Sequence, residues 1–153
     1  MRTTFFKLLA GVLAAHLAGL VGAATFLVDD SQSTVLDANL PLQWRSLSPA
    51  GSDHQVQGVT RVQVKLDTRA WVGKSVRMYM ALPAQAGGLV QARWQALGPL
   101  LSGQLSSGQR GLVWSGVVPS ALLEDVFTVT IQTDGRLLSS AQLLRFYFEV
   151  DVP

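Results

Sequence analysis

The side chains best suited to acid–base or nucleophilic chemistry occur at few places in this sequence. His54 follows Asp53, and many serines are present to supply the hydroxyl of a Ser-His-Asp arrangement. Outside the first 23 residues His54 is the sole histidine, and with so many serines some triad can always be drawn. We therefore interpret His54 as a loop histidine and predict no catalytic role for it.

Carboxylates occur in neighbouring pairs, as Asp29-Asp30 and Glu124-Asp125. Side chains adjacent in sequence seldom face one another across a substrate, as glycoside hydrolysis requires. The first pair, taken with Asp37, lacks the alternating ligand spacing and the central glycine of a calcium-binding loop. The chain has no cysteine, which excludes thiolate metal sites and thiol nucleophiles. We predict a non-enzymatic protein with no catalytic residue, cofactor or metal site.

Four tryptophans are the remaining residues of chemical interest. Trp94 and Trp114 share predicted strand faces with aliphatic residues, so we expect both to pack in a core. Trp71 lies among turn residues, and Trp44 lies in the least regular part of the chain. An exposed indole combines an apolar face with a polar N–H, which suits a sugar ring. Trp44 and Trp71 are therefore the predicted ligand surface, if the protein binds a ligand.

The elements that position these residues follow an export signal. Arg2 and Lys7 form a basic start, and residues 8–21 are an apolar stretch broken only by glycines and His16. Val21-Gly22-Ala23 then supplies the small residues of a cleavage site. We predict a signal peptide over residues 1–23 and a single domain over 24–153 in the periplasm, outside the cell or on its surface. An uncleaved membrane anchor is the alternative, but the apolar run is short for a span, so no stable membrane span is expected after cleavage.

The net charge changes once the signal is removed. The full chain has 12 Lys and Arg against 10 Asp and Glu. Two of the basic residues, Arg2 and Lys7, leave with the signal, so the remaining domain is formally neutral. The basic character therefore belongs to the targeting segment, and we predict no nucleic-acid partner.

Apolar and polar residues alternate along several stretches of the chain. Residues 59–66 place Val62, Val64 and Leu66 on one face, the period-two pattern of a half-buried strand. Further predicted strands cover residues 76–82, 89–97, 100–105, 112–118, 126–133 and 144–152.

Two connections between these strands have sequence signals of their own. Residues 119–125 begin with Pro and Ser and predict a helical turn. Asp134-Gly135 predicts a tight hairpin, because both residue types tolerate positive φ. Short strands joined by Gly, Pro and Ser turns predict an all-β, antiparallel, immunoglobulin-like β-sandwich, with a small β-barrel as the alternative.

An export signal, one sandwich and an aromatic closing strand together resemble proteins of bacterial chaperone–usher fimbriae. The residues that carry the resemblance are Asp134-Gly135-Arg136 and the closing run of residues 144–152. The resemblance implies protein partners, namely a periplasmic chaperone or pilus subunits. The chain has no cysteine pair, and its N-terminal apolar run over residues 26–28 is short. These departures favour a minor or accessory component over a major polymerising subunit.

The expected function is therefore a secreted, non-enzymatic protein that acts in assembly of a surface fimbria, with a ligand- or glycan-binding adhesin module as the alternative. Small sandwiches expose strand edges, and main-chain pairing at an edge is a common route to partner binding. Residues 26–28 and 144–152 are the predicted edges. In the closing strand, Phe146, Tyr147 and Phe148 are the predicted partner residues, with the two phenylalanines facing inward and Tyr147 facing outward.

Overall fold

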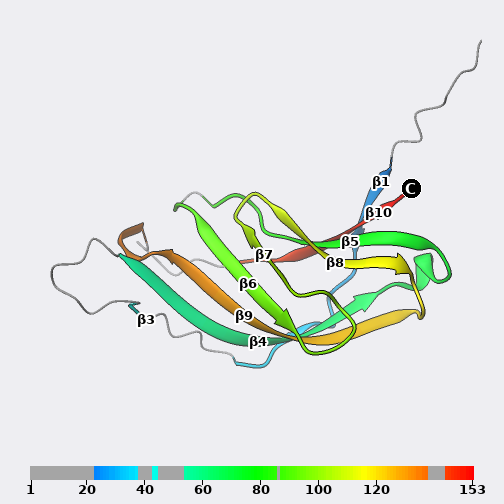
Figure 1. Ribbon diagram of the computed structural model, residues 1–153, viewed down its shortest axis with the longest axis horizontal. Helices are drawn as coiled ribbons and strands as arrows, with labels where there is room; N and C mark the ends of the chain where they lie inside the picture. Colours follow the sequence, from blue (N-terminus) through cyan, green and yellow to red (C-terminus); the bar gives the residue numbers. More distant parts are fainter. Residues whose placement is uncertain (1–22, 38–42, 45–53, 86, 138–143) are drawn as a thin grey trace, which may run out of the picture.

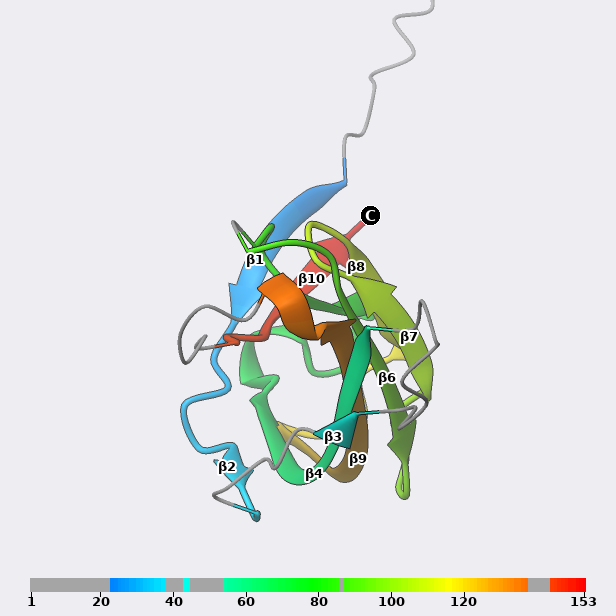
Figure 2. The same cartoon turned by 90° about the vertical axis from the view of Figure 1, so that its left-hand side faces the viewer.

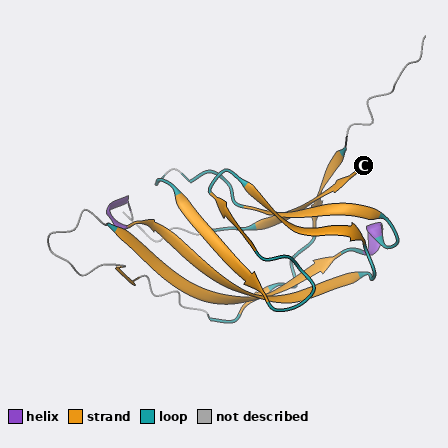
Figure 3. Ribbon diagram, in the orientation of Figure 1, coloured by secondary structure: helices purple, strands orange, loops and turns teal. Residues whose placement is uncertain are grey.

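The computed structural model describes residues 23–37, 43–44, 54–85, 87–137 and 144–153. The predicted signal peptide lies outside these ranges, apart from Ala23. Within them, helical structure is limited to two short 3-10 turns, η1 (Arg69–Trp71) and η2 (Gly135–Leu137) at opposite ends of the molecule (Figure 3). No helix in the described ranges has the length and apolarity to cross a membrane.

The described residues form ten strands. In chain order these are β1 (Ala24–Val28), β2 (Thr34–Val35), β3 (Gln43–Trp44), β4 (Gln55–Asp67), β5 (Ser75–Ala81), β6 (Val90–Ala96), β7 (Gly103–Ser106), β8 (Arg110–Val117), β9 (Leu122–Asp134) and β10 (Tyr147–Val152).

The strands make two antiparallel sheets that pack face to face (Figure 1). Sheet I has the order β1-β10-β5-β8, and sheet II has the order β2-β4-β9-β6-β7, with β3 also paired to β4. The predicted antiparallel β-sandwich is confirmed. Across the described ranges the two sheets stay separate, so the alternative of a small closed barrel is wrong.

The core follows the alternation seen in the sequence. On β5, Val76, Met78 and Met80 are at most 3% exposed, whereas the intervening Arg77 points to solvent. On β6, Val90, Ala92 and Trp94 are buried in the same way, which confirms that Trp94 shares an inward face with aliphatic residues. On β9, Phe127, Val129 and Ile131 face the same core. Because the side-chain period of a strand is two, a shift of one residue would expose this entire set.

Trp94 of β6 is the largest fully buried side chain. Its Nε1 donates a hydrogen bond to the Leu101 carbonyl oxygen at 2.8 Å, and its ring stacks on Phe127 with centroids 6.3 Å apart. Gly103 and Gly111 cover the ring, and a Cβ added at Gly103 would lie 2.6 Å from Trp94 Cζ2. Only glycine at these two positions leaves room for the Trp94 ring, so β7 and β8 can lie directly over it. The side of the sandwich formed by β7 and β8 is therefore closed.

The predicted helical turn over residues 119–125 is wrong. Leu122 already belongs to β9, which pairs with β4 over 13 residues. Leu123 and Asp125 are buried while Leu122 and Glu124 are exposed, so this stretch has the period of a strand. Pairing along the full length of β4 overrides the local signal of Pro and Ser.

The predicted tight hairpin at Asp134-Gly135 is also wrong. Gly135 begins η2, and it has no positive φ. The strands on either side, β9 and β10, belong to different sheets and are not hydrogen-bonded to each other. The connection therefore crosses between layers, which a two-residue turn cannot do.

Trp114 differs from its predicted position. The register of β8 against β5 shifts between Met78 and Tyr79, so Val113 is the extra residue of a β-bulge. Val113 is fully buried, Leu112 is 37% exposed, and Trp114 is half-buried at the margin of the core. Leu112 and Trp114 were the predicted inward residues of β8, but because of the bulge Val113 is the residue that points into the core.

Candidate functional site

The N-terminal strand β1 lies at the edge of sheet I (Figure 2). Its pairing with β10 runs from Ala24 opposite Val152 to Val28 opposite Phe148. At Asp29 the chain then crosses to the other layer, where Asp67 N donates a hydrogen bond to the Asp29 carbonyl oxygen at 2.9 Å. Sheet I therefore loses its edge strand next to Phe148.

The closing strand is not an edge over residues 148–152, because β1 covers one side of it and β5 the other. For this part of the strand, the predicted free edge is wrong. Tyr147 pairs with Ala81 of β5 alone, and among the described residues Phe146 has no strand partner. In the described part of the closing strand, the free margin is therefore confined to the start of β10 and the residues before it.

An apolar groove of about 520 Å³ opens between the sheets at this margin. Phe148 of β10 and Phe146, just before that strand, line one wall, and Val62, Phe127 and Ile131 of sheet II line the other. Its rim carries Asp30, Asp37 and Arg145. The groove is on the side of the sandwich where β1 and β2 are the outermost strands, opposite the side that β7 and β8 close.

The other face of β10 carries a charged cluster. The Arg110 guanidinium donates hydrogen bonds to Asp151 Oδ2 at 2.9 Å and to Glu149 Oε2 at 3.3 Å, and it lies 4.1 Å from the centre of the Tyr79 ring. The hydrogen bonds from Arg110, and then from Thr25, hold the pKa of the Asp151 carboxyl below its usual range. This cluster joins β8, β5, β10 and β1 across the outer face of sheet I.

The predicted ligand residues Trp44 and Trp71 are not brought together. Trp44 lies in β3, opposite Val56 near the start of β4, whereas Trp71 lies in η1 beyond the end of β4 (Figure 1). The strand from Val56 to Asp67 separates them by about 36 Å at the usual rise per residue. Trp71 itself is half-buried and packs against the core.

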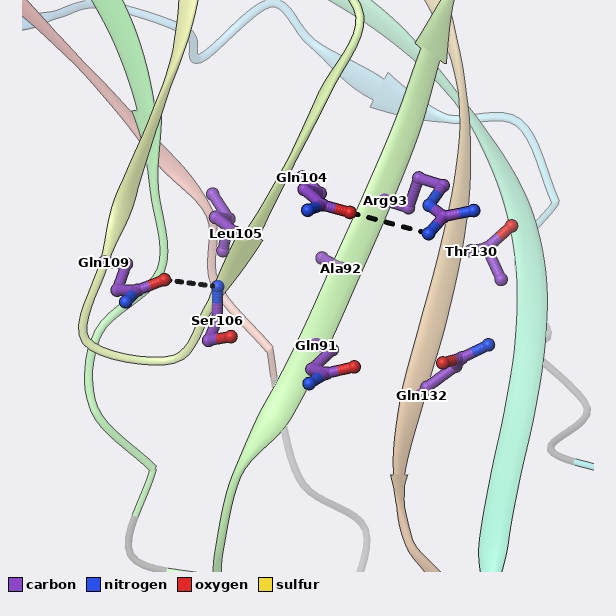
Figure 4. A pocket seen from close by; sticks show the side chains of 9 residues that line it. All are labelled: Gln91, Ala92, Arg93, Gln104, Leu105, Ser106, Gln109, Thr130 and Gln132. Carbon is purple, nitrogen blue, oxygen red and sulfur yellow. Dashed lines mark hydrogen bonds between the residues drawn. The ribbon is translucent and has the colours of Figure 1, made fainter.

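A second feature, which the sequence did not single out, is a polar hollow of about 270 Å³ on the outer face of sheet II. Figure 4 shows Arg93 and Gln91 on β6, with Gln104 of β7 on one side and Thr130 and Gln132 of β9 on the other. The remaining lining residues are Ala92, Leu105, Ser106 and Gln109. None of these nine residues is acidic. The available sequence signal was the repeated glutamine at outward strand positions.

Titratable residues in the described ranges do not gather into a metal-binding group of three or more His, Asp or Glu side chains. His54 is half-buried, and its carbonyl oxygen accepts a hydrogen bond from Gly135 N at 2.8 Å.

Asp125 is buried, and its carboxylate accepts hydrogen bonds from Leu97 N, Gly98 N and Leu100 N at 2.7–3.0 Å. That carboxylate anchors the connection between β6 and β7.

Comparisons with models of known protein families, with curated proteins and with solved structures found no match to this chain.

Proposed function

We propose that this protein is a secreted, non-enzymatic component of a bacterial surface fimbria, either an accessory subunit or a factor in its assembly. It binds its partner by main-chain strand addition beside Phe146, where β1 leaves sheet I. The observation that carries the proposal is the coincidence of this free strand margin with the opening of the apolar groove.

The groove supplies what strand addition needs beyond backbone hydrogen bonds. A strand added next to residues 144–146 would point alternate side chains toward the core, where Phe146 and Ile131 line an apolar wall. Main-chain pairing would supply affinity, and the shape of the groove would select the side chains. An extended apolar segment of a second protein is therefore the occupant we infer.

Exposed apolar residues along β1 also support a partner at this edge. Phe26 is 49% exposed and Leu27 is 72% exposed, and both are apolar residues of the edge strand β1. Natural edge strands usually carry charges or bulges that prevent pairing with other chains. An edge with apolar residues at these positions suits a surface that is covered in the assembled state.

Site-specific photo-crosslinking in the cells that produce the protein tests this proposal. A benzophenone amino acid is placed at Phe146 or Leu27, and at Gln95 on the outer face of sheet II as the control. We expect Phe146 and Leu27 to link to one exported protein, at residues of a single apolar segment mapped by mass spectrometry. No adduct from Phe146, or equal linkage of the same protein from Gln95, would contradict the proposal.

A matched pair of variants separates the groove from its surroundings. Phe146 lines the groove, whereas the adjacent Tyr147 does not. Phe146→Asp should abolish the adduct from Leu27, and Tyr147→Asp should retain it. Thermal unfolding of both variants establishes that each is folded under the conditions of the crosslink.

A further inference from the structure

Polar side chains cross the outer face of sheet II in a straight row. Gln91 of β6 lies opposite Ser106 of β7 on one side and Gln132 of β9 on the other, and Gln132 lies opposite Gln57 of β4. Neighbours in such a row are about 5 Å apart. The row therefore presents three amide groups in succession across the sheet.

These amides have hydrogen-bonding capacity that the described residues do not use. Gln132 Nε2 donates to Gln57 Oε1 at 3.3 Å, which leaves Gln132 Oε1 as an available acceptor. Gln104 Oε1 accepts from Arg93 Nη2 at 3.5 Å, which leaves Gln104 Nε2 as an available donor. Gln91 has no hydrogen bond to another described side chain. The hollow therefore offers both donors and acceptors.

Arg93 differs from the other basic residues of this face. Arg61 pairs with Asp37 at 3.3 Å, and Lys65 pairs with Glu124 at 3.2 Å. In the described ranges Arg93 has no carboxylate within ion-pair distance, and its hydrogen-bond partner is the neutral Gln104. Its guanidinium is thus available to an anionic group, and it has the geometry to bind a carboxylate through two parallel hydrogen bonds.

We propose that this hollow binds an acidic saccharide through one hexuronic acid unit. The sugar carboxylate pairs with Arg93, and the ring hydroxyls exchange hydrogen bonds with Gln91, Gln104 and Gln132. Arg93 lies two residues from Gln91 along β6, about 7 Å away, which is comparable to the width of a sugar ring with its substituents. The volume of about 270 Å³ is slightly below the range typical of sites for whole ligands, and it suits a single unit of a chain that continues into solvent.

The chemistry of the hollow favours a saccharide over an acidic peptide. A peptide that gains affinity from main-chain pairing needs a strand edge, whereas the hollow lies on a sheet face over β7, β6 and β9. The inward side chains of these strands, such as Trp94, are buried beneath the face and offer no side-chain pocket. Sugar hydroxyls both donate and accept, which matches a row of amides.

This inference is independent of strand addition at Phe146, because the two sites lie on different sheets and share no lining residue. Either can fail without the other. The probe is an oligogalacturonate trimer, with a galactose trimer as its neutral counterpart. It is titrated at physiological ionic strength into the ¹⁵N-labelled protein exported with its own leader, and side-chain amide resonances are followed by NMR.

We expect the acidic trimer to shift the glutamine side-chain amides of the hollow, and the neutral trimer to bind more weakly. Arg93→Gln should reduce affinity by about tenfold or more, the effect of losing a bidentate charged pair. Lys74→Gln makes the same charge change at an exposed residue far from the hollow and should leave affinity unchanged. Gln132→Leu removes ring contacts but keeps Arg93, and should also weaken binding of the trimer.

Several outcomes would overturn the proposal. One is the absence of any shift in the hollow. A second is equal loss of affinity in Arg93→Gln and Lys74→Gln, which means non-specific attraction. A third is acetate producing the same shifts at the same concentration, which means a bare anion site. A fourth is a glutamate tripeptide binding as tightly as the sugar, which means an acidic peptide site.

Discussion

Val28 of β1 lies opposite Phe148 of β10, and the two side chains are only 5% and 4% exposed. This pair is the last rung between β1 and β10 before the chain turns away at Asp29. Phe148 therefore belongs to the core and forms the inner part of the groove wall, whereas Phe146, two residues earlier, is only half-buried there. The position of this last rung sets where another strand can continue the sheet.

The first prediction concerns the register of β10. Phe148→Ala should lower the free energy of unfolding by about 3–5 kcal/mol, because it removes a buried aromatic ring and leaves a cavity. Glu149→Ala, the adjacent outward position, loses one exposed ion pair with Arg110 and should cost less than about 1 kcal/mol. Denaturant unfolding measures both. Equal costs would show that the register is displaced by one residue.

The second prediction concerns Asp125. Asp125→Ala should destabilise the protein by about 3 kcal/mol, because three backbone N–H groups would lose a charged acceptor at a buried position. Glu124→Ala is the matched control, since its exposed carboxylate pairs with Lys65 and should contribute less than about 1 kcal/mol. A cost for Asp125→Ala no larger than the control would contradict the anchoring role.

The sequence was sufficient to predict the sandwich and most strand faces, because alternation such as Val62, Val64 and Leu66 depends only on one buried side. It was insufficient at connections. The signal of Asp134-Gly135 is local, whereas the choice between a hairpin and a crossing to the other sheet depends on which strands pair. The bulge at Val113 shifted the inward face of β8 for the same reason.

The candidate sites were less accessible to sequence reasoning. Phe146 could be named, but its free margin depends on where β1 leaves the sheet, which alternation does not reveal. Trp44 and Trp71 were grouped by residue type and are separated by most of β4. The hollow around Arg93 depends on cross-strand register, because Gln91 and Gln132 are far apart in sequence and opposite in the sheet.

The third prediction is a pH dependence. The pKa of Asp151 is lowered by hydrogen bonds from Arg110 and Thr25, so the folded protein binds fewer protons there than the unfolded chain does. Its contribution is present above the ordinary pKa of 3.8 and is lost as pH falls through the lower folded value. Asp151→Asn should therefore flatten the acid side of the stability profile, measured by denaturant unfolding at several pH values.

Asp30 provides a control of opposite sign. Burial raises the pKa of the Asp30 carboxyl, so its charged form disfavours the folded state near and above its titration range. Asp30→Asn should remove that penalty and make the loss of stability in acid steeper. If both variants change the profile in the same direction, the assignment of these two carboxylates is wrong.

The fourth prediction concerns export. The exported protein should begin at Ala24, the first residue of β1, because Val21-Gly22-Ala23 has the small residues of a cleavage site. Ala23→Arg should block processing and leave the precursor in the cell, whereas Ala24→Ser should be processed normally. N-terminal sequencing of exported protein that still begins at Met1 would exclude cleavage.

Hydrogen exchange at residues 144–146 tests strand addition most directly, because it reports on the backbone groups that would pair. The protein alone is compared with the complex isolated through the Leu27 cross-link. Strand addition predicts rapid amide exchange at these residues in the free protein. In the complex, the amides that point to the added strand should exchange slowly, approaching the rate of the core strand β5. A complex in which residues 144–146 exchange as fast as in the free protein would contradict strand addition at this margin.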